Sequence, residues 1–247
     1  MPGAQPPSSS TLLLNRLLHQ AATRPTHPAF IEGDRVTSFG ALAALIAAQG
    51  EALRSSIQPG DRVAVVMDNC AELAVAIYAI WWAGGVAVAL NPALKPTDIA
   101  QLTETCQARS CWTALPAAPA PAPADATPHT TQSEALASLV FTSGTTGQPK
   151  GVMLSHGALA ANALAVQQTL PMSPDDVTLC VLPFHYAFGS SVLHTHLSLG
   201  ATLVLENSFM YPQRIVQRMA QVAATHFYGV PSSFYLLLER GQLSAQP

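Results

Sequence analysis

A chain of 247 residues is long enough for one large domain or two small ones with a substantial buried core. Only 10% of its residues are charged and the net charge is −3, which excludes the basic surface that nucleic-acid binding requires. The four cysteines form no C-x-x-C pair and no metal-site spacing, so we expect small buried residues of a reduced, cytoplasmic protein.

The first predicted element is an amphipathic helix. Residues 12–18 are apolar enough to raise the question of a signal peptide, but no basic residues precede them, and Asn15 and Arg16 interrupt the run. The pattern favours a helix capped near Ser10 or Thr11.

An uncharged run at residues 73–90 is long enough to invite assignment as a transmembrane helix, which needs about 20 apolar residues. Gly84-Gly85 divides this run into a predicted helix at 71–83 and a predicted strand at 86–90. A further strand is predicted just before it, at 61–67. We therefore expect no membrane span, because strand, helix and strand in this order are typical of a parallel sheet covered on both faces.

The composition changes to Ala, Pro and Thr at residues 115–132, which we interpret as a linker or an exposed loop. It would separate a first portion, 1–114, from a second, 133–247. The alternation resumes after it, with strands predicted at 201–205 and 226–230 and a helix at 212–224. The sequence therefore predicts an α/β fold with mostly parallel sheets flanked by helices.

Residues 139–151, LVFTSGTTGQPKG, have the composition of a phosphate-binding loop. The apolar residues at 139–141 predict a buried strand before the loop, and residues 152–166 predict a helix after it. The glycines let the backbone bend toward an anion, the Ser and Thr residues offer hydroxyl donors, and Lys150 adds a mobile positive charge.

The loop differs from the Walker A motif, which has Gly immediately before its Lys and Ser or Thr immediately after it. Here Pro149 precedes Lys150 and Gly151 follows it, so the hydroxyl that holds magnesium in that motif is missing. This argues against an ordinary P-loop NTPase. A surface turn rich in Ser, Thr and Gly is the alternative interpretation.

Residues 142–151 resemble the phosphate loop of the adenylate-forming enzymes, which include acyl-CoA synthetases, aryl-CoA ligases, luciferases and the adenylation domains of peptide synthetases. The resemblance extends from about residue 12 to residue 240. Four further segments resemble elements of this superfamily in the same order: VTSFGAL at 36–42, WAGGVAVALNP at 82–92, LPFHYAFG at 182–189 and GVP at 229–231.

This resemblance implies ATP-dependent activation of a small carboxylic acid. Acyl-adenylate and pyrophosphate would form first, and the acyl group would then pass to the thiol of CoA or of a phosphopantetheine on an acyl carrier protein. Mg²⁺ would arrive with the nucleotide, so no metal-binding residue is assigned. Lys150 and Thr145 would be catalytic, and with Thr146 they would hold the β- and γ-phosphates. The implied cofactor-binding residues are Thr142, Ser143, Gly144, Thr145, Thr146, Gly147, Lys150 and Gly151.

The segment at 182–189 would form the acid pocket. The position that is His in many acyl- and aryl-CoA ligases falls on Tyr186, and Ala187 stands where amino-acid-activating members have an Asp. A methyl group cannot hold an ammonium, which disfavours an amino acid substrate. Phe184, Tyr186 and Phe188 predict an apolar wall for an aliphatic or aromatic acid, with packing of all three in the core as the alternative. The implied pocket residues are Phe184, His185, Tyr186, Gly189, Gly229 and Pro231.

Three elements that relatives carry beyond the GVP segment are not found: Y-G-x-T-E, T-G-D and a small C-terminal domain with its Lys. The resemblance therefore implies the first half of an adenylate-forming enzyme, one that binds ATP weakly by itself. Two alternatives stay open. One is the adenylation domain of a peptide synthetase, and the other is a non-catalytic module that binds nucleotide or a partner.

Three histidines outside these segments are candidate functional residues. His194 and His196 would share one face if they lay on a strand, as a pair of metal ligands does, but no third ligand is nearby and ordinary polar roles are favoured. His156 follows the phosphate loop, and a supporting or capping role is expected for it.

Overall fold

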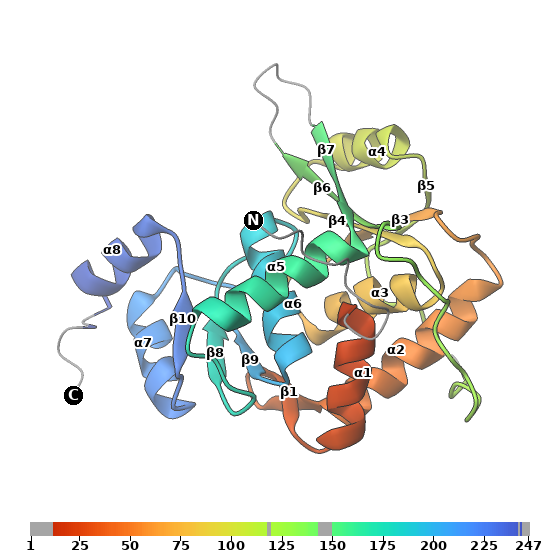
Figure 1. Ribbon diagram of the computed structural model, residues 1–247. Coiled ribbons are helices and arrows are strands. Elements are labelled where there is room, and N and C mark those ends of the chain that lie inside the picture. The colour runs from red at the N-terminus through yellow and green to blue at the C-terminus, as the bar shows by residue number, and fades with distance from the viewer. Residues whose placement is uncertain (1–11, 118–119, 143–149, 242, 244–247) are drawn as a thin grey trace, which may run out of the picture.

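The computed structural model describes residues 12–117, 120–142, 150–241 and 243. These residues alternate between strands and helices and form two five-stranded sheets (Figure 1). Sheet A has the strand order β10-β8-β9-β1-β2, and sheet B has the order β5-β3-β4-β6-β7. The strands of sheet A are β1 (Pro28–Glu32), β2 (Arg35–Ser38), β8 (Val177–Cys180), β9 (Thr202–Leu205) and β10 (His226–Tyr228). Those of sheet B are β3 (Arg62–Val66), β4 (Val86–Leu90), β5 (Ala108–Trp112), β6 (Leu136–Thr142) and β7 (Lys150–Ser155).

Eight helices accompany these strands in the described part of the chain. They are α1 (Leu13–Thr23), α2 (Phe39–Arg54), α3 (Ala71–Trp82), α4 (Pro96–Thr105), α5 (His156–Thr169), α6 (Ala187–Leu199), α7 (Pro212–Gln221) and α8 (Pro231–Glu239). The main core lies between the sheets: α1, α2, α3 and α6 contribute buried side chains to it together with β1, β3, β4 and β9.

Most strand pairs are parallel, which confirms the predicted fold class. The exceptions are β1 with β2 and β6 with β7, which pair antiparallel at one edge of each sheet. Both sheets are therefore mixed.

The uncharged run around residue 80 is a buried helix and strand. Every residue of α3 except Glu72 is buried, because the helix has β3 and β4 on one side and α1 and α2 on another. Gly84 separates it from β4 with φ +83, a left-handed conformation that favours glycine. Over the described residues, none of the helices has both the length and the apolar character needed to cross a bilayer.

The prediction of a helix over residues 152–166 is wrong in its first part. Residues 150–155 form β7, which pairs with β6 in a register that sets Val152 opposite Val140. The helix α5 begins only at His156, where the Ser155 hydroxyl accepts a hydrogen bond from Ala158 N at 3.1 Å. The glycine-rich loop therefore joins two antiparallel strands.

The segment at 115–132 is a loop without helix or strand in its described residues, and it joins β5 to β6 of the same sheet. It packs against the end of α3, where His129 N donates to Trp82 O at 2.8 Å. Sheet A combines strands from both sides of this loop, since β1 pairs with β9. The division at 115–132 stays a prediction.

Two smaller predictions are corrected. The N-cap of α1 falls on Leu12, whose side chain makes no capping hydrogen bond, and the predicted caps Ser10 and Thr11 lie outside the described residues. Cys106 and Cys180 are buried as expected, but Cys111 is exposed because it lies on the edge strand β5. The cytoplasmic location remains a prediction.

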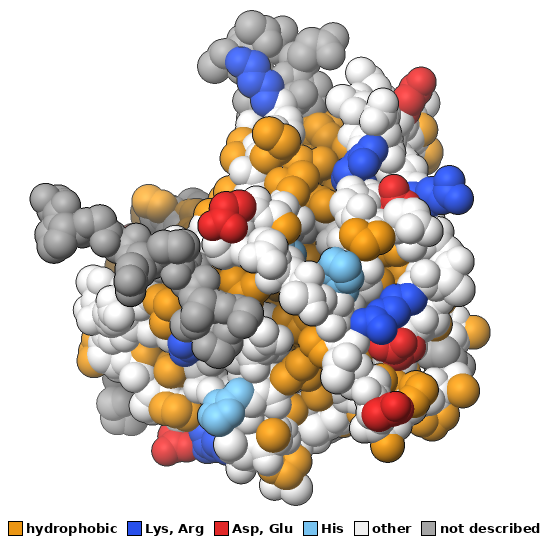
Figure 2. Space-filling model, turned by 45° about the vertical axis from the view of Figure 1, so that its right-hand side comes forward, with side chains coloured by type: hydrophobic (Ala, Val, Ile, Leu, Met, Phe, Trp, Pro, Cys, Tyr) orange, Lys and Arg blue, Asp and Glu red, His pale blue; other side chains and the backbone are white. Residues whose placement is uncertain are grey.

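Several large apolar side chains are exposed on the outside of the molecule. Figure 2 shows hydrophobic side chains gathered along the centre of one face, with charged side chains around them. On α8 and its N-cap, Val230, Phe234 and Leu238 recur every four residues, and all three are exposed. Since residues at this spacing share one side of a helix, α8 has an uncovered apolar face.

Candidate functional site

The glycine-rich loop extends from the open end of the β6–β7 hairpin. Thr142 and Lys150 form its last residue pair, and the Thr142 hydroxyl donates to Lys150 O at 3.4 Å. Thr142, Lys150 and Gly151 are all exposed at this end. The predicted phosphate-binding residues Ser143, Gly144, Thr145, Thr146 and Gly147 lie outside the described residues.

The hairpin removes one possible basis for anion binding at this loop. A loop that leads directly into a helix offers an anion the helix N-terminus and its dipole. Here the six residues of β7 separate the loop from α5, which is roughly 20 Å of extended chain. Binding of phosphate would rest on the charge of Lys150 and on hydroxyl and backbone donors.

The segment at 182–189 is held by Asn69, which follows β3. The Asn69 side-chain amide donates to Leu182 O at 2.7 Å, and its oxygen accepts from Phe184 N at 2.8 Å. Asn69 is 7% exposed, so both hydrogen bonds are shielded from water. They tie the carboxyl ends of β3 in sheet B and β8 in sheet A together.

A cavity of ≈ 260 Å³ lies where these two regions meet. It combines the end of β4, the helix α4 and the base of the glycine-rich loop with the segment at 182–189. Its position at the carboxyl ends of parallel strands is where ligands bind in open α/β sheets. The lining residues are Ala89, Leu90, Asn91, Leu94, Leu102, Phe141, Thr142, His185 and Tyr186.

Four polar side chains line the cavity: Asn91, Thr142, His185 and Tyr186. The rings of His185 and Tyr186 lie 4.3 Å apart between centroids. Asn91 Nδ2 donates to the Tyr186 hydroxyl at 3.4 Å. His185 Nε2 is buried and has no hydrogen-bond partner among the described residues.

Burial lowers the pKa of His185 below its ordinary value, and the nearby Asp68 carboxylate opposes part of this shift. The imidazole is therefore neutral at pH 7. A buried ring nitrogen without a partner is costly, and a ligand group that supplies one recovers that free energy. The arrangement can hold an uncharged or anionic oxygen between an apolar wall and a neutral imidazole.

The remaining predicted pocket residues are not part of this cavity. Phe184 is 1% exposed and packs in the core. A Cβ at Gly189 would lie 2.1 Å from Pro183 O, so glycine is required there for the close approach of α6 to the preceding loop. Gly229 follows β10 and Pro231 is the first residue of α8, and neither lines this cavity.

Sequence reasoning missed Asn69 and gave Asn91 no role. Both lie one to three residues beyond the end of a buried parallel strand, Asn69 after β3 and Asn91 after β4. Polar residues at this position of consecutive strands were the available signal, because those strand ends meet at one edge of the sheet.

His194 and His196 lie on α6 and are buried in the core. The Tyr78 hydroxyl and His194 Nδ1 are 3.0 Å apart, and burial lowers the pKa of His194 to about 3. His156, the first residue of α5, packs its ring against Trp81 at 5.3 Å between centroids. Within the described ranges, no cluster of three or more metal-binding side chains is present.

The sequence and the fold were compared with known proteins. A family model described as "AMP-binding enzyme" matches residues 17–247. Gramicidin S synthase 2 of Brevibacillus brevis is 31% identical over 201 residues, which are 74% of this chain and 4% of that protein. Feruloyl-CoA synthase of an Amycolatopsis species is 28% identical over 237 residues, 88% of this chain and 48% of that protein.

A solved structure gives the same result. The fold matches that of o-succinylbenzoate CoA synthetase of Bacillus subtilis, solved in complex with its acyl-adenylate intermediate, with a TM-score of 0.82. The two sequences are 26% identical, and the match covers 91% of this chain and 64% of the synthetase chain. The chain thus spans about half the length of feruloyl-CoA synthase and a small part of gramicidin S synthase 2. Since one family model matches it almost from end to end and its relatives include CoA ligases and peptide synthetases, the chain belongs to the AMP-binding enzyme family.

Proposed function

We propose that this chain forms the phosphate-binding and acid-binding part of an ATP-dependent acid–thiol ligase. The reaction would convert a carboxylic acid into an acyl-adenylate and then into a thioester of CoA or of carrier-protein phosphopantetheine. The observation that carries this proposal is the ≈ 260 Å³ cavity, because it joins the base of the glycine-rich loop to His185 and Tyr186. Phosphate and acid would meet at this junction.

The charge and hydrogen-bond donors at the loop suit the phosphates of a nucleoside triphosphate. Lys150 is exposed, and none of the residues that line the neighbouring cavity, all within the described chain, is acidic. An accessible ammonium next to hydroxyl and backbone donors suits phosphate oxygens. ATP would supply an electrophilic α-phosphorus and a pyrophosphate leaving group, with Mg²⁺ carried by the nucleotide. Within our proposal, Lys150, Thr145 and Thr146 hold the β- and γ-phosphates.

The cavity wall favours a small aliphatic or aromatic acid. Leu90, Leu94, Leu102 and Phe141 form an apolar surface that excludes water from one side of the bound acid. Tyr186 and Asn91 supply polar groups at its other side. Ala187, the first residue of α6, provides no carboxylate for a substrate amino group.

The test is acid-dependent exchange of pyrophosphate into ATP by the natural protein. Suitable acids are those of the class in the relatives' names, such as 3-hydroxybenzoate, compared with a series of amino acids. Lys150→Ala should lower the exchange rate about 100-fold or more, since the charge it removes faces the phosphates. Lys95→Ala is the matched control, because Lys95 is the other lysine of the chain and is also exposed.

One other function is favoured by a specific observation. The chain is 31% identical to gramicidin S synthase 2 over 201 residues, so activation of an amino acid is the second candidate function. Exchange supported by amino acids and not by simple acids would replace our proposal with this one. ATP binding without exchange on any acid would instead favour a non-catalytic nucleotide-binding module.

A further inference from the structure

A second cavity lies on the opposite face of sheet B. It has a volume of ≈ 420 Å³ and lies between α2 and the edge strand β5. It shares no lining residue with the ≈ 260 Å³ cavity at the candidate site, here called the acid cavity. The walls of the second cavity contact the main core, whereas the walls of the acid cavity contact the hydrophobic cluster around Leu90 and Leu102. The lining residues are Gln49, Ala52, Leu53, Ser56, Ile57, Arg109, Ser110, Trp112 and Pro116.

A β-bulge brings Arg109 to this cavity. Arg62 of β3 is opposite Ala108, and the next residue, Val63, is opposite Ser110, so Arg109 is an extra residue in β5. A bulge of this kind turns a side chain away from its regular alternation along the strand. Among the described residues, the Arg109 guanidinium makes no hydrogen bond or ion pair.

Two polar groups beside Arg109 also lack partners. Ser110 Oγ is buried and makes no hydrogen bond to any described residue. Gln49 is 3% exposed, and its amide nitrogen donates to Pro116 O at 3.1 Å, while its oxygen accepts nothing from the described chain. An unpaired buried hydroxyl lowers stability, and a ligand that pairs with it recovers this free energy.

The rest of the cavity is uncharged and mostly apolar; Ser56 is polar, and its hydroxyl donates to Leu53 O at 2.9 Å. Leu53 and Ile57 are buried, and the half-buried Trp112 indole presents a flat surface beside them. No lining residue, all of them in the described chain, is acidic, so Arg109 leaves the site with a net positive charge. A cavity of this volume holds a small organic molecule.

We propose that this second cavity binds a small aromatic monocarboxylate. The carboxylate pairs with the Arg109 guanidinium and accepts a hydrogen bond from Ser110 Oγ, and the ring packs between Trp112 and Leu53. The Gln49 amide oxygen accepts from a ring hydroxyl where the ligand has one. This site does not depend on the nucleotide, and its ligand would not be activated there because neither Thr142 nor Lys150 of the glycine-rich loop lines it.

The experiment is a titration of the natural protein with benzoate in the absence of ATP, followed by tryptophan fluorescence. Trp112 lines the cavity, so the change in emission is expected from its indole and should be lost in Trp112→Phe. Saturable binding is expected, and Arg109→Gln should raise the dissociation constant at least about tenfold, the usual effect of losing a charged hydrogen bond. Arg240→Gln, which removes an exposed charge after α8, should leave it unchanged.

Two further measurements decide whether the site is the one proposed. Benzamide, which has the same shape without the charge, should bind more weakly than benzoate to the unaltered protein and equally to Arg109→Gln. Tyr186→Ala, in the acid cavity, should not alter the fluorescence titration. Unchanged affinity in Arg109→Gln, loss of the signal in Tyr186→Ala, or no saturable binding up to the solubility limit of benzoate would each overturn the proposal.

Discussion

The buried histidines of the core have a pH dependence that follows from their burial. His156, His194 and His196 have their pKa lowered to about 4, 3 and 4, in each case mainly by desolvation. The folded state keeps all three neutral, whereas the unfolded chain protonates them near the ordinary value of about 6.5. Their contribution to stability is therefore complete above about pH 6.5 and is lost as the pH falls from there toward 4.

We expect the free energy of unfolding to decrease between pH 6.5 and pH 4.5 by up to about 1.4 kcal/mol per pH unit for each of these histidines. Urea unfolding at a series of pH values measures this decrease. His194→Gln should reduce the slope, and His19→Gln should not, because His19 is exposed on α1. An equal slope in both variants would contradict this explanation.

Gly189 is a second case in which one residue controls local geometry. Gly189→Ala should destabilise the protein by about 1–3 kcal/mol, because the added Cβ would meet Pro183 O and force α6 away from the segment that carries His185. Thermal unfolding measures the loss. The neighbouring Ser190→Ala is the control, and a similar effect of both substitutions would show that the close approach is not the cause.

At the scale of elements, Asn69 connects the two sheets at the candidate site. Asn69→Ala should cost about 2–3 kcal/mol, because it leaves the Leu182 carbonyl and the Phe184 amide without partners in a buried place. Asn69→Asp keeps the acceptor for Phe184 N and loses the donor to Leu182 O, so its cost also includes a buried charge. Chemical denaturation compares the two, and a neutral effect of Asn69→Ala would contradict the role given to this residue.

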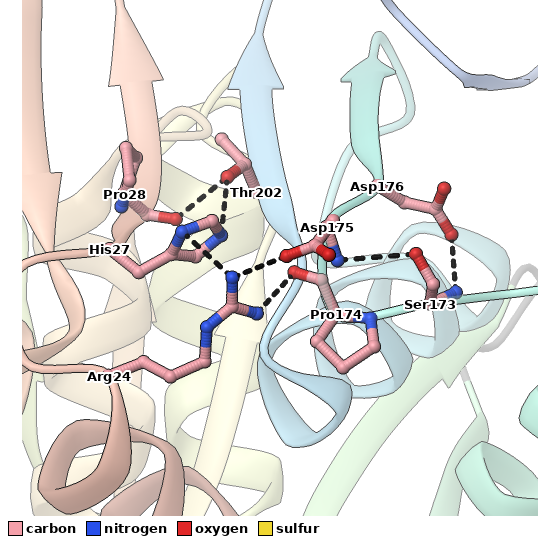
Figure 3. Close-up of polar contacts among 8 residues, drawn as sticks. All are labelled: Arg24, His27, Pro28, Ser173, Pro174, Asp175, Asp176 and Thr202. Atoms are coloured by element: carbon pink, nitrogen blue, oxygen red, sulfur yellow. Dashed lines mark hydrogen bonds and ion pairs between the residues drawn. The ribbon is translucent and has the colours of Figure 1, made fainter.

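A second connection between elements is polar and exposed. The Arg24 guanidinium, just after α1, donates to Pro174 O at 2.7 Å and pairs with Asp175 at 2.5 Å, while Thr202 joins His27 and Pro28 on the other side (Figure 3). Asp175 is 83% exposed, so its ion pair is screened by water.

Asp175→Asn should therefore change the free energy of unfolding by less than about 1 kcal/mol. Arg24→Ala should cost more, because it also removes the hydrogen bond to the Pro174 carbonyl. Denaturation at low and high salt separates the two contributions. A large effect of Asp175→Asn that disappears in salt would mean that the ion pair itself holds α1 in place.

The prediction of secondary structure was wrong where pairing with another strand outweighed the helical propensity of the local sequence. The helix predicted from residue 152 begins four residues later, because Val152 and its neighbours complete a ladder with β6. Residues that are rich in Ala and Leu have helical propensity, but a β-branched residue beside a complementary strand gains more from pairing. The partner strand lies across the glycine-rich loop, so a local window does not contain it.

At the scale of the whole molecule, the chain spans about half of feruloyl-CoA synthase and leaves apolar surface uncovered on α8. Residues 1–247 produced by themselves should therefore bind ATP weakly and form no measurable acyl-adenylate, since the elements that the resemblance assigns to ribose binding and to the small C-terminal domain are not in them. Calorimetry with ATP and pyrophosphate exchange measure both properties. Adenylate formation by these residues alone would refute this expectation.

The sequence by itself determined the family, the α/β class and the strand–helix–strand unit at β3, α3 and β4, because these depend on local motifs and on apolar runs of limited length. Only the tertiary structure decided that the glycine-rich loop joins the two strands of a hairpin, that Phe184 belongs to the core and that Asn91, His185 and Tyr186 share one cavity. These features join residues about 10 to 100 positions apart. Such contacts form only when both sheets are assembled, and no local pattern encodes them.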